Sequence, residues 1–147
     1  MTAMLPMSKK FKPPVPKEDD EQAAVISYLL FRKNNLGDRL RWHHSPNGDG
    51  REKKVGRDGK RYCPSGQRLA AQGTSPGFPD LIVICDRYPS DEKPVHVAIE
   101  MKRRNGRPSD VTPEQREWLS FLALCGWQTR ACFGAQEAIN FLRECGI

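Results

Sequence analysis

The sequence predicts an α/β sandwich in which a mixed sheet of about four strands is flanked by helices. Two runs of strand length, 79–84 and 95–102, are rich in Val and Ile and are joined by a polar segment that contains two prolines. Such a connection is typical of a hairpin, so we expect these two strands to be antiparallel neighbours. Helical patterns precede and follow the pair, and a further alternating run, 127–133, lies between the last two helices.

Length and composition are consistent with one basic domain. A chain of 147 residues fits a single domain with a core of moderate size. A hydrophobic content of 37% and a mean hydropathy of −0.68 indicate sizeable solvated segments. The net charge of +6 favours a polyanionic partner, although charge alone does not separate an enzyme from a passive binder. No run approaches the roughly 18 apolar residues that span a bilayer, and no secretory leader precedes the domain, so we expect a cytoplasmic protein without a membrane partner.

The cysteines and histidines do not form a zinc-binding pattern. Five cysteines are an odd number and include no CxxC pair, which argues against a disulfide framework and a structural zinc site. His43 and His44 are adjacent, and only His96 lies elsewhere. We therefore interpret the cysteines as reduced thiols and the histidine pair as strand residues. A zinc-stabilised adaptor is the weakest alternative.

The first elements are a tail and a helix. Residues 1–18 are rich in Pro and Lys without any period, which predicts a disordered basic tail that is either simply solvated or in contact with nucleic acid. The domain then covers 19–147. A helix to about Lys33 can be capped by Asp19 or Asp20, and its apolar stripe comprises Val25, Ile26, Leu29 and Leu30.

Glu21 lies at the edge of that buried stripe, four residues before Val25. An uncompensated carboxylate there would be costly, so it needs a partner. The partial positive charge of a helix N-terminus explains Glu21 as a structural residue. A metal ion or an ordered water is the functional alternative.

A strand at 40–44 is followed by a turn and by a basic insertion. Residues 48–72 carry seven basic and three acidic side chains, a formal charge of +4, together with five glycines. We expect a flexible insertion that binds the nucleic-acid backbone. Its candidate contacts are Arg51, Lys53, Lys54, Arg57, Lys60 and Arg61.

The hairpin brings together a candidate site. If the strands 79–84 and 95–102 are antiparallel, Asp80 at the start of the first lies beside Glu100 and Lys102 at the end of the second. Glu100 and Lys102 share one face, because side chains alternate along a strand, and Met101 points to the other. Two adjacent carboxylates repel each other unless a cation lies between them, and oxygen ligands of this kind suit Mg²⁺ or Mn²⁺. These residues predict a metal-assisted hydrolytic site for a phosphate ester, with Lys102 near the attacking water.

Three arginines follow the site directly. Arg103, Arg104 and Arg107 lie within five residues of Lys102. Arginine binds phosphate bidentately, so we expect contacts with the substrate backbone, and a solvated loop is the alternative.

A helix from Pro113 to about Cys125 begins with the capping box Thr112 to Gln115. Capping explains Gln115 as a structural residue. Its place on the core-facing stripe with Trp118, Leu119 and Leu122 also permits a role in the site, and both can hold at once. A strand at 127–133 and a helix from Ala135 to Cys145 complete the domain.

These motifs resemble a known nuclease family. Pro79-Asp80 followed by Glu100-x-Lys102 resembles the PD-(D/E)xK nuclease signature. Residues 77–81, 99–102 and 109–119, together with Gly126, resemble its virus-type replication-repair nuclease (VRR-NUC) branch. The resemblance covers about Glu21 to the C-terminus, and the insertion at 48–72 is longer and richer in glycine than the compact family version.

The resemblance implies a restriction-endonuclease-like fold and a divalent-metal-dependent DNA endonuclease. It implies that Asp80 and Glu100 bind Mg²⁺ or Mn²⁺ with help from Glu21, and that Lys102 and Gln115 belong to the catalytic site. It further implies a phage or bacterial setting, a homodimer, and branched DNA such as four-way junctions as a substrate in replication, repair or recombination. The alternative from the residues themselves is a nucleic-acid-binding module without catalysis, in which the carboxylates only cap or pair with Lys102. Neither reading needs a small-molecule cofactor.

Overall fold

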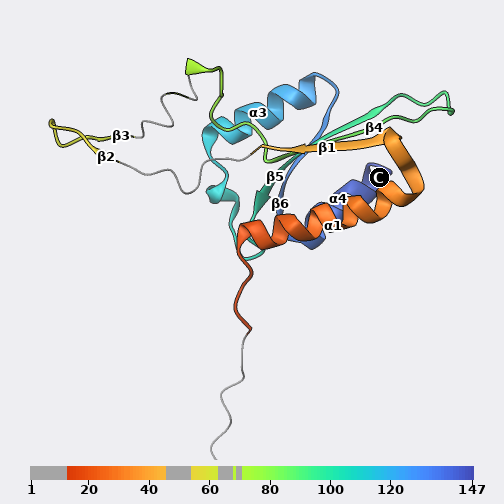
Figure 1. The fold of residues 1–147 in the computed structure, drawn as a ribbon, viewed down its shortest axis with the longest axis horizontal. Helices are drawn as coiled ribbons and strands as arrows, with labels where there is room; N and C mark the ends of the chain where they lie inside the picture. The colour runs from red at the N-terminus through yellow and green to blue at the C-terminus, as the bar shows by residue number, and fades with distance from the viewer. Residues whose placement is uncertain (1–12, 46–53, 63–67, 69–70) are drawn as a thin grey trace, which may run out of the picture.

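The computed structural model describes residues 13–45, 54–62, 68 and 71–147 and confirms the predicted α/β sandwich. Its main sheet has the strand order β1-β4-β5-β6. Figure 1 shows α1 and α4 side by side on one face of this sheet and α3 on the other. A separate two-stranded sheet, β2-β3, lies in the predicted insertion.

The central hairpin forms as predicted. Strand β4 (Leu81–Cys85) runs antiparallel to β5 (Val95–Lys102), and Leu81 pairs with Ile99. Strand β1 (Leu40–His44) adds to the other edge of β4, also antiparallel. Strand β6 (Gln128–Phe133) runs parallel to β5 and makes the sheet mixed.

One face of the sheet forms the core. Alternate residues of β4 and β5 are fully buried against α1 and α4, because each strand presents every second side chain to that layer. Their apolar side chains are those of Leu81, Val83, Val97, Ile99 and Met101. Glu100 and Lys102 belong to the opposite face, as the alternation predicts.

Helix α1 (Glu18–Leu36) is longer than predicted and begins differently. Its N-cap is Lys17, whose backbone N–H donates to Asp20 Oδ2 at 3.2 Å, so neither Asp19 nor Asp20 is the cap itself. Val25 and Leu29 are fully buried, whereas Leu30 is 54% exposed, and the apolar stripe is therefore narrower than we expected. A helix packed by one edge against α4 and the sheet leaves room for fewer inward residues.

The remaining elements follow the prediction closely. Helix α3 (Pro113–Leu124) has Thr112 as its N-cap, and the Thr112 hydroxyl accepts from Gln115 N. Helix α4 (Ala135–Glu144) buries Ala138 and Leu142. No described helix is long and apolar enough to cross a membrane.

The insertion contains structure that the sequence analysis did not predict. Strands β2 (Lys54–Val55) and β3 (Arg61–Tyr62) pair antiparallel around a turn that holds Gly59 at φ 75°. The tail up to residue 12 and most of the rest of the insertion lie outside the described residues.

Candidate active site

Two buried carboxylates meet where the hairpin strands end. Leu81 pairs with Ile99, so Asp80, one residue earlier, stands opposite Glu100, one residue later. Asp80 is 6% exposed and Glu100 is 1% exposed. The Oδ2 atom of Asp80 accepts a hydrogen bond from Met101 N at 2.8 Å, which fixes this carboxylate against the end of β5.

The turn before Asp80 is held against α3. Gly77 has φ +79°, and a Cβ added there would lie 2.5 Å from the backbone carbonyl carbon of Glu114. Only glycine therefore permits this close approach, which brings the first turn of α3 next to the carboxylates. The sequence analysis did not predict this contact with α3, since a one-dimensional pattern does not report which backbone a glycine touches.

Lys102 and Gln115 converge on one oxygen of Glu100. The Lys102 ammonium donates to Glu100 Oε1 at 2.7 Å, and the side-chain amide of Gln115 donates to the same oxygen. Gln115 Oε1 at the same time accepts from Thr112 N at 2.9 Å. One side chain thus caps α3 and contacts the site, as the sequence analysis allowed.

The other oxygen of Glu100, Oε2, is buried and accepts no hydrogen bond from a donor among the described residues. Burial and the neighbouring charge of Asp80 raise the pKa of Glu100 to about 7, against the lowering effect of Lys102. Burial alone would lower the pKa of Lys102, but its hydrogen bond and ion pair with Glu100 prevail and raise it, so Lys102 is protonated at neutral pH.

The donor set fits a divalent cation. A buried carboxylate oxygen without a donor, beside a second carboxylate that disfavours its ionisation, is the environment that a Mg²⁺ or Mn²⁺ ion stabilises. Within the described residues, no group of three or more His, Cys, Asp or Glu side chains is arranged to hold a metal. Asp80 and Glu100 would therefore have to share the ion with backbone oxygens, water or substrate.

Glu21 lies close to this site but has other partners. It is 2% exposed, its Oε1 accepts from Arg104 Nε at 2.5 Å, and its Oε2 accepts from Ala135 N at 2.9 Å. The hydrogen bond from Arg104 lowers the pKa of Glu21 in spite of the desolvation that burial imposes. In this structure, the buried carboxylate of Glu21 is therefore compensated by the guanidinium of Arg104 and by the backbone N–H of Ala135 at the N-terminus of α4.

The predicted DNA-binding residues fall into two groups. Arg103, Arg104 and Arg107 are exposed on the segment that directly follows β5. Arg57 and Lys60 are exposed in the β2-β3 turn. The structure does not describe Arg51 and Lys53 or the side chains of Lys54 and Arg61.

Neither the histidines nor the cysteines form a metal-binding group among the described residues. His43 and His44 are exposed on β1, where they pair with Ile82 and Leu81. Cys85, Cys125, Cys132 and Cys145 are free thiols. Burial raises the pKa of Cys132 to about 12, so its thiol stays protonated at neutral pH.

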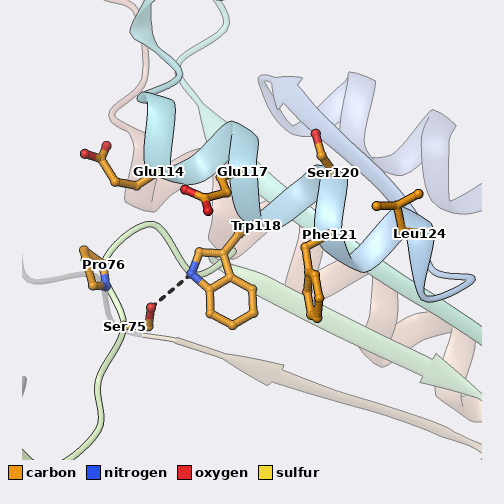
Figure 2. A pocket seen from close by; sticks show the side chains of 8 residues that line it. All are labelled: Ser75, Pro76, Glu114, Glu117, Trp118, Ser120, Phe121 and Leu124. Carbon is orange, nitrogen blue, oxygen red and sulfur yellow. Dashed lines mark hydrogen bonds between the residues drawn. The ribbon is translucent and has the colours of Figure 1, made fainter.

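An apolar groove of about 520 Å³ runs along the outside of α3. Figure 2 shows Trp118 and Phe121 pointing from α3 in one direction, with Ser75 and Pro76 on the facing loop. Trp118 Nε1 donates to Ser75 Oγ at 3.2 Å, and its ring packs edge-on against Phe78 at 5.0 Å. The ionic side chains of the lining are Glu114 and Glu117, both acidic, so the groove does not suit a phosphate and Trp118 serves as a packing anchor.

Comparison with known families matches residues 53–136 to the model of the VRR-NUC domain. The matched region is more than half of the chain and contains Asp80, Glu100, Lys102 and Gln115. The chain belongs to the VRR-NUC family. Glu21 lies outside the matched region, although the sequence resemblance extended to it.

A solved structure supports the same fold. This structure, a "VRR_NUC domain protein", superposes with a TM-score of 0.55 over 88% of each chain, at 22% sequence identity. At that identity the likeness concerns the fold alone, and it confirms the VRR-NUC architecture for this chain. No curated protein matches the sequence.

Proposed function

We propose that this VRR-NUC domain is a divalent-metal-dependent DNA endonuclease. Its catalytic site, which hydrolyses phosphodiester bonds of the DNA, comprises Asp80, Glu100 and Lys102. The single observation that carries the proposal is the buried pair of carboxylates with Glu100 Oε2 left without a donor. A purely structural pair would not be expected to leave a buried carboxylate oxygen unsatisfied, because this is costly. The family match supports a nuclease chemistry for the pair.

Asp80 and Glu100 would hold Mg²⁺ or Mn²⁺. When bound, the ion supplies Lewis-acid stabilisation of phosphoryl charge and lowers the pKa of a bound water. The Met101 N–H keeps the Asp80 carboxylate aimed at the end of β5. Lys102 and Gln115 fix the Glu100 carboxylate by occupying Oε1, which leaves Oε2 as its ligand oxygen.

Lys102 acts in its protonated form in this proposal. The raised pKa keeps an ammonium next to Glu100 at neutral pH. A protonated lysine does not abstract a proton from water. The ammonium can donate a hydrogen bond to a lone pair of the attacking water and thereby orient it. It can also offset the negative charge that develops on the phosphate.

The exposed arginines after β5 and the basic β2-β3 turn would hold the DNA backbone. The family resemblance extends the proposal to branched DNA such as four-way junctions, to replication, repair or recombination, and to a homodimer. A panel of junction, flap, duplex and single-stranded DNA tests the substrate preference, and light scattering tests the dimer.

The deciding experiment is a cleavage assay with purified protein and the DNA panel. We expect cleavage in Mg²⁺ or Mn²⁺ and none in EDTA. DNA that is bound but never cut under either metal would overturn the catalytic proposal and favour a nucleic-acid-binding module.

A further inference from the structure

We infer that Arg104 binds a backbone phosphate of the DNA with a guanidinium that Glu21 orients in advance, so that Glu21 is a positioning residue for DNA instead of a metal ligand. The inference rests on the proposed function and deepens it. It concerns an ion pair between the first turn of α1 and the residues that follow β5.

The carboxylate of Glu21 differs from that of Glu100 in its bonding. Each oxygen of Glu21 accepts a hydrogen bond, Oε1 from Arg104 and Oε2 from the backbone N–H of Ala135. Glu100 instead has one oxygen with two donors and one with none. Glu21 therefore already has cationic and dipolar compensation for its burial, whereas Glu100 still lacks it on one side.

The guanidinium of Arg104 is bonded to Glu21 through Nε, and its two Nη nitrogens remain available to a ligand. Glu21 occupies Nε, and the two Nη nitrogens make no hydrogen bond with any described residue. The Arg104 side chain is 57% exposed, against 2% for Glu21. A guanidinium has five N–H donors in a planar fork, so the end pair stays available to grip two oxygens of one phosphate.

Backbone contacts of the β6-α4 turn fix the position of the Arg104 side chain. Gly134 has φ +90°, and a Cβ there would lie 2.8 Å from Arg104 Cβ, so the β6-α4 turn packs directly on Arg104. Gly134 N also donates to the carbonyl of Lys102 at 2.8 Å. The arginine is thus tied to the same turn as the end of β5, two residues beyond Lys102, where it can reach a phosphate that flanks the one to be cut.

Advance orientation lowers the cost of binding. A free arginine side chain loses considerable rotamer freedom when it grips a ligand. The ion pair with a buried carboxylate has already removed much of that freedom, so more of the contact energy appears as affinity. The buried acid therefore increases DNA affinity although its own charge is negative.

The test is DNA binding in EDTA, measured by fluorescence anisotropy, where neither metal binding nor cleavage contributes. We expect Arg104→Gln to raise Kd about tenfold, and Glu21→Gln to raise it about threefold to tenfold because an amide no longer holds the guanidinium. The double variant should be no weaker than Arg104→Gln alone. Arg103→Gln is the matched control, and its effect should multiply with that of Glu21→Gln because the structure shows no contact between these two residues.

Two outcomes would overturn the inference. One is unchanged metal-free binding in Glu21→Gln together with a higher Mn²⁺ concentration for half-maximal cleavage, which would make Glu21 a metal ligand. The other is Arg104→Lys binding as tightly as wild type, which would mean that only the charge matters and not the oriented fork. Arg104→Lys alters an exposed side chain, so it keeps the inference testable if Glu21→Gln does not fold.

A wild-type protein that binds DNA in EDTA but never cuts it would refute the proposed catalysis and leave this inference intact.

Discussion

Gln115 joins the N-terminus of α3 to Glu100 by donating from its amide nitrogen to Glu100 while its amide oxygen accepts from Thr112 N. The cap and the site therefore share one side chain. Its two functions can be separated, because a glutamate would keep the acceptor for the cap and lose the donor for Glu100.

We predict that Gln115→Glu slows cleavage by about tenfold to a hundredfold, since the new carboxylate repels Glu100 where the amide had fixed it. The matched variant Thr112→Ala removes a cap hydroxyl that does not touch Glu100. It should lower the free energy of unfolding by about 1 kcal/mol and leave the cleavage rate unchanged. Single-turnover cleavage and urea unfolding of both variants check this, and a Gln115→Glu protein that cuts like wild type would remove Gln115 from the site.

The carboxylate pair makes the metal-free protein less stable as the pH rises. Burial and the charge of Asp80 raise the pKa of Glu100 from 4.5 to about 7. Between these two values the folded protein holds a proton that the unfolded chain has released, so its free energy of unfolding falls by on the order of 3 kcal/mol from about pH 4.5 to about pH 7.

Asp80→Asn should weaken this pH dependence without abolishing it, because it removes the repelling charge but leaves the burial of Glu100, which is the larger cause of the raised pKa. The variant should also be more stable than wild type at pH 8 in EDTA. Asp38→Asn, on a side chain that is 91% exposed, is the control and should keep the wild-type profile. Urea unfolding at pH 5 and pH 8 measures both. A wild-type protein that is equally stable at the two pH values would show that burial and the charge of Asp80 do not raise the pKa of Glu100 as described.

Lys102 is predicted to assist the chemical step. Lys102→Ala should slow turnover by about 10² to 10³ if the ammonium orients water and offsets developing charge. Its effect on KM should be small, because the side chain donates to Glu100 and lies largely buried. Steady-state kinetics separate the two parameters, and unchanged turnover would exclude Lys102 from the mechanism.

The basic segments should make DNA binding strongly dependent on salt. Each phosphate contact releases counterions, so the slope of log K against log salt reports how many contacts form. Arg57→Gln and Lys60→Gln, both in the β2-β3 turn, should each reduce that slope by about 0.9 if these side chains contact phosphates. A slope that neither change alters would place the DNA away from this turn.

The main features of the fold follow from local patterns. Alternation and the two prolines predicted the hairpin, and its register then placed Asp80 opposite Glu100 without further information. The capping box predicted the start of α3, because its residues are only three positions apart. Such short-range rules are reliable when every participant lies within a few residues along the chain.

Long-range contacts could not be predicted in the same way. Glu21 has its partners 83 and 114 residues further on, at Arg104 and Ala135, and no period links these positions. Leu30 follows the helical stripe in sequence but is exposed, because the neighbouring layer does not extend over it. The β2-β3 hairpin was missed because its strands have two residues each within a charged, glycine-rich run.

The most direct test of the account compares cleavage and binding in Asp80→Asn and Glu100→Gln. Metal ions stabilise a phosphoryl transition state by several kcal/mol, and each 1.36 kcal/mol is a factor of ten, so loss of either ligand should slow Mg²⁺-dependent cleavage by about 10³ or more. Kd for DNA should stay within about twofold of wild type, since neither carboxylate is proposed to contact the backbone phosphates that give affinity. Variants that cut DNA as fast as wild type would contradict the account.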